Sequence, residues 1–167
     1  MNVYLIGFMG AGKSYLGKKL AQELGRPFAD MDTWIEKTAG QTIKEIFEQQ
    51  GEDTFRKLEA DHLRKSKKHK QLIVATGGGT PCFHGGMDWM LQNGHVVFID
   101  PPLDTLFSRL EKERGHRPLV SGELDFRRSI AERLAERRSI YEKAHLIMRG
   151  DNDEQEVLRL IKKSLQP

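Results

Sequence analysis

The stretch "LIGFMGAGKSYLG" (residues 5–17) decides the fold. It follows a short apolar run and places three glycines directly before Lys13 and Ser14. Residues 7–14 fit the pattern G-x-x-x-x-G-K-[S/T] of a phosphate-binding loop, set between an expected strand and an expected helix. Glycines let successive backbone N–H groups curve around an anion, and the start of a helix adds unpaired N–H groups. A chance glycine-rich turn is the alternative, but strand, motif and helix together favour a nucleotide site.

The motif also predicts what binds. Lys13 supplies a point charge to the β- and γ-phosphates, and the hydroxyl of Ser14 is a suitable ligand for Mg²⁺. We therefore expect a nucleoside triphosphate, ATP, bound together with Mg²⁺. The residues expected to contact it from this loop are Gly10, Ala11, Gly12, Lys13, Ser14 and Tyr15.

Composition sets the class of protein. The chain has 167 residues, of which 38% are hydrophobic and 31% charged, which suits one domain with a buried core. A single cysteine, Cys82, excludes an internal disulfide framework, and we expect it to be a packing residue. No apolar segment is long enough to span a bilayer, and the N-terminus lacks the features of a signal peptide. We expect a monomeric cytoplasmic protein without membrane contacts.

The net charge is only +3, but one basic run, "RKSKKHK", occupies residues 64–70. Such a run could contact nucleic acid. A solvated helix end is the favoured interpretation, because cations suit the C-terminal end of a helix dipole. We therefore expect no nucleic-acid partner.

Strands and helices alternate along the chain. Strands are expected at 2–6, 27–32, 71–76, 95–100 and 145–149, and helices at 13–25, 33–39, 43–69 with a break near Gly51, 85–92, 103–112, 125–142 and from about 153. This alternation predicts an α/β fold, a three-layer sandwich around a five-stranded parallel sheet. The polar segment 113–124 is long and irregular, which is typical of a lid or binding loop.

Two acids, Asp30 and Asp32, come at the end of the second expected strand. Residues two apart on a strand share a face, so both carboxylates can point the same way. One could organise the Mg²⁺ shell while the other accepts a proton from an attacking hydroxyl. A helix N-cap is the alternative for either, and Asp32 also fits that role. Strand 71–76 does not end in the usual metal-binding aspartate, which favours Asp30 for Mg²⁺.

Further candidates lie at loops and on helices. "GGG" at 77–79 follows a strand directly, which suggests close approach of the backbone to a ligand. Arg56 has Glu59 three residues on, which could be no more than a surface ion pair. Arg117, in the irregular segment, could reach transferring phosphates or remain solvated.

Arg137 is unusual in its own helix. At about 100° per residue it falls on the apolar face together with Phe126 and Ile130. A buried arginine needs an anionic partner, because leaving it unpaired is costly. A structural carboxylate or the carboxylate of a substrate held by two hydrogen bonds could serve.

The ordered set "GFMGAGKS", "FADMD", "FRKLE", "TGGGTP", "HRPLV" and "RRSIY" resembles the shikimate kinase family over nearly the whole chain. The resemblance implies a fold of the nucleoside monophosphate kinase class, one domain over 1–167 with a mobile lid at about 113–124 and a shikimate-binding helical region at about 33–61. It implies phosphoryl transfer from ATP to the 3-hydroxyl of shikimate, giving shikimate 3-phosphate on the route to chorismate and the aromatic amino acids.

The resemblance also assigns roles. Asp32 resembles the aspartate that contacts the shikimate hydroxyls, and Arg56 and Arg137 resemble the pair that holds its carboxylate. The carried-over set is completed by Gly78 and Gly79 beside the substrate, Arg117 as the lid arginine on ATP, and Ser14 with Asp30 at the metal. Lys13, Asp32 and Arg117 are the expected catalytic residues. Arg109 is a candidate for the adenine side.

Two other functions remain open from the residues. A gluconate kinase on the same scaffold would also need a carboxylate clamp, but the set "FRKLE", "GGG" and "RRSIY" argues against it. A nucleotide-binding regulator without catalysis would not need Asp32 and the substrate arginines.

Overall fold

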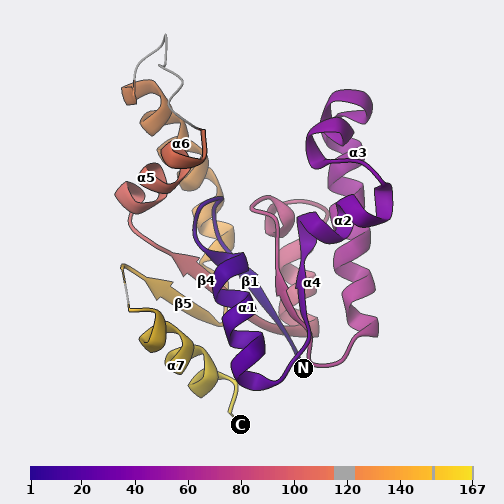
Figure 1. Ribbon diagram of the computed structural model, residues 1–167, viewed down its shortest axis with the longest axis vertical. Helices are drawn as coiled ribbons and strands as arrows, with labels where there is room; N and C mark the ends of the chain where they lie inside the picture. Colours follow the sequence, from indigo (N-terminus) through magenta and orange to yellow (C-terminus); the bar gives the residue numbers. More distant parts are fainter. Residues whose placement is uncertain (115–122, 152, 167) are drawn as a thin grey trace.

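The computed structural model describes residues 1–114, 123–151 and 153–166, and its centre is a five-stranded parallel sheet in the order β2-β3-β1-β4-β5 (Figure 1). The strands are β1 (Asn2–Ile6), β2 (Phe28–Asp30), β3 (Ile73–Ala75), β4 (Gly94–Asp100) and β5 (Leu146–Arg149). All four neighbouring pairs are parallel. The predicted sheet is confirmed.

The described helices are α1 (Lys13–Leu24), α2 (Met31–Ala39), α3 (Ile43–Lys65), α4 (Gly86–Asn93), α5 (Leu103–Arg114), α6 (Glu123–Tyr141) and α7 (Glu154–Ser164), with short 3-10 turns η1 (Ser66–Lys68) and η2 (Thr80–Cys82). Gly51 interrupts α3 with φ +81° and ψ 170°, so the expected break is confirmed. None of these helices is long and apolar enough to cross a bilayer.

The two faces of the sheet are both covered. Tyr4 packs against Trp89 of α4, with ring centroids 6.0 Å apart. Leu5, the next residue of β1, lies against Gly17 of α1. Successive strand residues point to opposite faces, so α1 and α4 lie on opposite sides of the sheet. All five residues of β1 are buried, as a central parallel strand requires.

The second strand is shorter than the sequence predicts. β2 stops at Asp30, and Asp32 lies in the first turn of α2. The reason is local: the side chain of Asp30 accepts a hydrogen bond from Thr33 N, 3.1 Å away, and so begins a helix two residues early. The placement of both acids on one strand face was wrong, and so was Asp32 as the N-cap.

The basic run 64–70 covers the last turn of α3 and the turn η1. Lys65, Lys67, Lys68 and Lys70 are exposed. The predicted helix end is confirmed.

Candidate active site

The loop after β1 has the backbone of an anion cradle. Gly10 and Gly12 have φ of +77° and +93°, values that residues with a side chain rarely adopt. Gly12 is the N-cap of α1, and no side chain caps that helix start. The amides of the first turn therefore remain available for an anion, and the helix dipole favours one there. In Figure 1 this loop lies beyond the C-terminal end of the central strand β1, between α5 and α6 on one side and α2 and α3 on the other.

Lys13 is buried at the base of the loop. Its Nζ donates to the carbonyl oxygens of Gly7 and Phe8, each 2.9 Å away. Burial lowers its pKa to about 8, although attraction to Asp32 and Asp30 opposes the change. The ammonium is therefore held close to the loop, poised between charged and neutral forms at slightly alkaline pH.

Ser14 and Asp30 are adjacent, as the sequence predicts for a metal pair. The hydroxyl of Ser14 donates to Oδ2 of Asp30, while Oδ1 is occupied by the Thr33 amide. A hydroxyl and a carboxylate are the hard oxygen ligands that Mg²⁺ prefers. Over residues 1–114, 123–151 and 153–166 there is no cluster of three metal-binding side chains. The pair therefore fits an ion held mainly by phosphates and water.

Asp32 faces the same space from the first turn of α2. Neighbouring atoms crowd its carboxylate although the residue keeps access to solvent, and this desolvation raises its pKa to about 6. The negative charges of Asp30 and Glu59 raise it further, and Lys13 opposes them. A Cβ atom added to Gly77 would lie 3.5 Å from Oδ1 of Asp32, so the carboxylate is in van der Waals range of the glycine run. A carboxylate with such a pKa can accept a proton near neutral pH.

The glycine run at 77–79 is pressed against charged side chains. A Cβ on Gly77 would overlap Oε1 of Glu59, and a Cβ on Gly79 would overlap the guanidinium of Arg56. A side chain at either position would displace Glu59 or Arg56, because the backbone passes directly beside these side chains of α3. The predicted approach of this backbone to a ligand stays a prediction.

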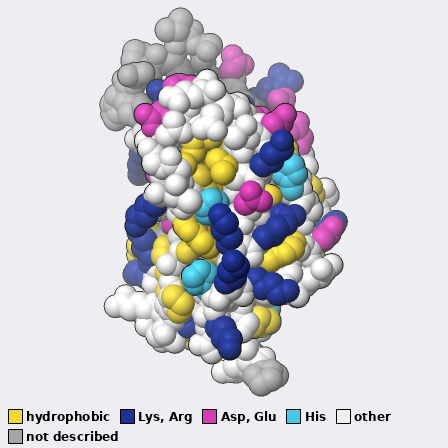
Figure 2. Space-filling model, turned by 90° about the vertical axis from the view of Figure 1, so that its right-hand side faces the viewer, with side chains coloured by type: hydrophobic (Ala, Val, Ile, Leu, Met, Phe, Trp, Pro, Cys, Tyr) yellow, Lys and Arg dark blue, Asp and Glu magenta, His cyan; other side chains and the backbone are white. Residues whose placement is uncertain are grey.

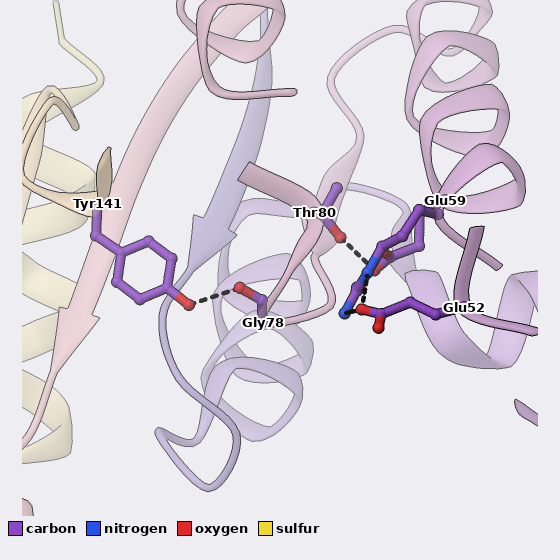
Figure 3. A network of polar contacts seen from close by, with 6 residues as sticks. Glu52, Glu59, Gly78, Thr80 and Tyr141 are labelled. Atoms are coloured by element: carbon purple, nitrogen blue, oxygen red, sulfur yellow. Dashed lines mark hydrogen bonds and ion pairs between the residues drawn. The ribbon is translucent and has the colours of Figure 1, made fainter. Parts of the chain in front are cut away.

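Glu59 is the centre of a buried polar network (Figure 3). Only 2% of Glu59 is exposed; its Oε2 accepts from Arg56 Nη1 at 2.6 Å and its Oε1 from the Thr80 hydroxyl at 2.8 Å. Glu52 accepts two further hydrogen bonds from Arg56 at 3.1 Å. The Arg56 guanidinium also lies 4.3 Å from the ring centroid of Phe83. The idea of a mere surface ion pair was wrong, because Glu59 is buried.

Arg137 approaches the glycine run from α6. A Cβ atom added to Gly78 would lie 3.4 Å from Nη1 of Arg137. The guanidinium carbon of Arg137 is 5.7 Å from the ring centroid of Phe8. Ile130 and Leu134 are buried on the same face of α6, so the predicted apolar setting is confirmed. No carboxylate of the described residues forms an ion pair with Arg137. Arg56 is paired, whereas Arg137 retains an uncompensated charge.

Sequence reasoning missed Tyr141. This side chain is fully buried, and its hydroxyl donates to the carbonyl oxygen of Gly78 at 2.5 Å (Figure 3). Burial raises its pKa to about 12, opposed by a contact with Arg137. Tyr141 follows Arg137 by one helical turn, and this spacing was the available signal. The tyrosine fixes the middle glycine of the run beside the arginine.

The nucleotide side forms a cavity of about 560 Å³ lined by Gly10, Gly12, Lys13, Ser14, Tyr15, Arg109, Lys112 and Glu113. Arg109 donates to the carbonyl oxygen of Gly10 at 3.0 Å, so it lies beside the glycine loop. The hydroxyl of Tyr15 donates to Glu154 at 2.6 Å. Ala11 is buried under the loop. Arg117 lies outside the described residues.

Cys82 lies close enough to Arg137, Arg56 and Glu59 for their charges to act on its thiol. The residue is half-buried, and burial raises the pKa of its thiol. A raised pKa disfavours the reactive thiolate, which fits the prediction of a packing residue.

Comparisons with known proteins agree along the whole chain. The family model described as shikimate kinase matches residues 9–166. A shikimate kinase of Bacteroides fragilis is 39% identical over 156 residues, which cover 90% of this chain and 86% of that one. The crystal structure of a shikimate kinase from Bacteroides thetaiotaomicron superposes with a TM-score of 0.90 at 32% identity, covering 99% and 98% of the two chains. That of the Acinetobacter baumannii enzyme in complex with shikimate gives a TM-score of 0.86 at 34% identity, covering 99% and 95%.

Proposed function

The chain belongs to the shikimate kinase family, and on that premise we propose how its residues divide the work of the reaction. The reaction is ATP-dependent phosphorylation of the 3-hydroxyl of shikimate, which gives shikimate 3-phosphate and ADP in aromatic amino acid biosynthesis. The observation that best supports this assignment of roles concerns Arg137. Its guanidinium is partly buried directly beside the glycine run and has no carboxylate partner among the described residues. An arginine in that setting stabilises an anionic ligand.

The experiment that tests this function is release of ADP from Mg-ATP. We expect release to depend on shikimate and gluconate to be inactive. ADP release driven equally by gluconate, or independent of both acids, would contradict the assignment. The second result would indicate a nucleotide-binding protein of another kind.

At the nucleotide end, the amides of Gly10–Tyr15 cradle the triphosphate and Lys13 neutralises its terminal charge. Ser14 and Asp30 would hold Mg²⁺ at this end, and the bound ion would neutralise charge on the β- and γ-phosphates. Asp30 has a second task, because its other oxygen fixes the start of α2. The position of Asp32 is thereby tied to the same carboxylate that organises the metal.

At the shikimate end, Arg56 and Arg137 hold the substrate carboxylate, and the backbone of Gly78 and Gly79 lies against the ring. The two arginines are not equivalent. Glu59 and Glu52 orient Arg56 but also offset its charge, so Arg137 contributes more of the attraction. Asp32 accepts the proton of the 3-hydroxyl as that oxygen attacks the γ-phosphorus.

Transfer needs water excluded from the phosphorus, because water is a competing nucleophile. We propose that residues 113–124 form the lid and that Arg117 contacts ATP when the lid closes. Residues 33–61, which include most of α2 and most of α3, would form the shikimate-binding region of a single domain over 1–167. We further propose a monomeric cytoplasmic enzyme with ATP and shikimate as its partners, without nucleic-acid or membrane contacts.

Tyr141→Phe is expected to raise the KM for shikimate by about 3–10-fold, because one buried hydrogen bond to Gly78 is lost. The KM for ATP should stay within about twofold, since neither Tyr141 nor Gly78 belongs to the loop that binds the triphosphate. Steady-state kinetics with each substrate varied in turn separates the two constants. Tyr15→Phe, which removes a hydroxyl on the nucleotide side, is the matched control and should leave the KM for shikimate unchanged. An equal increase in the KM for shikimate and the KM for ATP in Tyr141→Phe would indicate general destabilisation instead.

Affinity for ADP in the absence of shikimate is expected to fall above pH 8. The pKa of Lys13 is about 8 in the free protein, and bound phosphate favours the protonated form. Below that pH the ammonium is already charged; above it, each further pH unit costs up to about tenfold in affinity until the pKa of the complex is reached. Phosphate groups titrate near pH 6 and are already ionised over this range. Calorimetric titration between about pH 7 and pH 10 measures the change, and constant affinity would contradict the role of Lys13.

A further inference from the structure

A second cavity of about 560 Å³ lies along β2 and between α1 and α2, and Asp30 is the residue that it shares with the proposed metal site. β2 is an edge strand, because only β3 pairs with it. The cavity is lined from three sides: by Lys18 of α1, by Phe28 of β2, and by Trp34 and Lys37 of α2. His69, between η1 and β3, also lines it. Cavities of this size suit small ligands.

The lining of the cavity carries more positive than negative charge. Lys18 and Lys37 are both exposed, and neither forms an ion pair with any carboxylate of the described residues. Asp30 is the acid among the lining residues, and it keeps its negative charge because the Ser14 hydroxyl and the Thr33 amide that donate to it are neutral. Two lysines against one aspartate leave an excess of positive charge, and an anion in the cavity would meet two ammonium groups from different helices.

The cavity also offers fixed aromatic surface. Trp34 makes edge contacts with two histidines, His62 at 5.3 Å and His69 at 5.8 Å between ring centroids. These contacts hold the indole in place beside Phe28. Figure 2 shows the face of the molecule over α2 and α3, where Lys and Arg side chains gather around histidine and hydrophobic ones. Aromatic surface between cations matches a flat ring that bears a negative group.

We propose that this cavity is a binding site for a small aromatic carboxylate, in addition to the shikimate and ATP sites and bordering the metal site at Asp30. Its walls link it to catalysis. Lys18 follows Lys13 by five residues on α1, and Lys37 follows Asp32 by five residues on α2. A ligand that bridges Lys18 and Lys37 contacts both helices whose first turns carry the catalytic groups. Binding in the cavity is thereby coupled to nucleotide binding.

The test uses 2-naphthoate as the probe in calorimetric titrations at low ionic strength. Saturating shikimate, ADP and Mg²⁺ fill the catalytic site throughout, so that binding there does not contribute. We expect one molecule of 2-naphthoate per chain, and the neutral 2-naphthalenemethanol should bind at least about tenfold more weakly. The double variant Lys18→Glu/Lys37→Glu should lose at least about tenfold in affinity for 2-naphthoate.

The matched control is Lys143→Glu/Lys163→Glu, which changes the net charge equally at two exposed lysines away from the cavity. It should bind 2-naphthoate like the unaltered protein, and thermal denaturation checks that both variants are folded. Equal affinity for the acid and the alcohol, unchanged affinity in Lys18→Glu/Lys37→Glu, or no binding of 2-naphthoate would overturn the site. The coupling is measured apart: saturating 2-naphthoate should change the KM for Mg-ATP by about fivefold or more, and an unchanged KM would refute the coupling.

Discussion

Asp32→Asn is expected to lower kcat by about 10²–10⁴-fold, the range that a positioned general base contributes. Asparagine keeps the shape of the side chain and its hydrogen bonding to hydroxyls, but it does not take up the proton of the 3-hydroxyl. The KM for ATP should change little, because Lys13 and the loop amides hold the triphosphate. Steady-state ADP release at saturating substrates measures the effect.

The pH profile separates a base from a residue that only orients the substrate. The pKa of Asp32 is raised to about 6 in the free protein, so the active carboxylate is protonated as the pH falls through that value. kcat/KM for shikimate should therefore decrease about tenfold per pH unit below pH 6, and Asp32→Asn should lack this limb. Asp88→Asn, which removes an exposed carboxylate of α4, is the control and should behave like the unaltered enzyme. A loss of less than about fivefold in kcat for Asp32→Asn, with the acid limb retained, would exclude proton transfer to Asp32.

Arg137→Ala is expected to raise the KM for shikimate by about 10²–10³-fold, because truncating one partner of a desolvated charge pair typically costs 2–5 kcal/mol. Arg56→Ala should have a smaller effect on the same constant, since Glu59 and Glu52 already offset the charge of Arg56. Kinetics with shikimate varied at saturating ATP measure both. The ranking of the two variants tests the asymmetry of the clamp.

Two further variants sharpen this prediction. Arg137→Lys keeps the positive charge but loses the bidentate hydrogen bonding of the guanidinium to a carboxylate. Its KM for shikimate should therefore lie between those of the unaltered enzyme and Arg137→Ala. Arg128→Ala removes an exposed arginine of the same helix that pairs with Glu132 and should leave the KM for shikimate unchanged. An unaltered KM in Arg137→Ala would remove the carboxylate clamp from the account.

The sequence was most informative where function depends on local order. Residues 7–14 predicted the loop, its helix and the lysine, because that motif is contiguous and its physics is local. The buried run 2–6 likewise predicted a central strand. Asp32 was misplaced because two local rules compete at 27–32: the apolar pattern favours a longer strand, while Asp30 begins a helix by capping it.

The polar networks could not be predicted from spacing alone. Thr80 and Glu59 are 21 positions apart in the chain, and Tyr141 and Gly78 are 63 apart. No periodic pattern links such residues, so their contacts appear only when the sheet brings α3, the glycine run and α6 together. The need of Arg137 for an anionic partner could be predicted because a cation on an apolar helix face is visible in the local sequence. No local feature of the sequence singles out Glu59 or Tyr141 in this way.

The most direct test of the central claim is a crystal structure with shikimate and a non-hydrolysable ATP analogue bound together. We predict the shikimate carboxylate within about 2.7–3.1 Å of guanidinium nitrogens of Arg56 and Arg137, and the 3-hydroxyl between Asp32 and the γ-phosphorus. Guanidinium groups that point away from the carboxylate, or a 3-hydroxyl turned from Asp32, would contradict it.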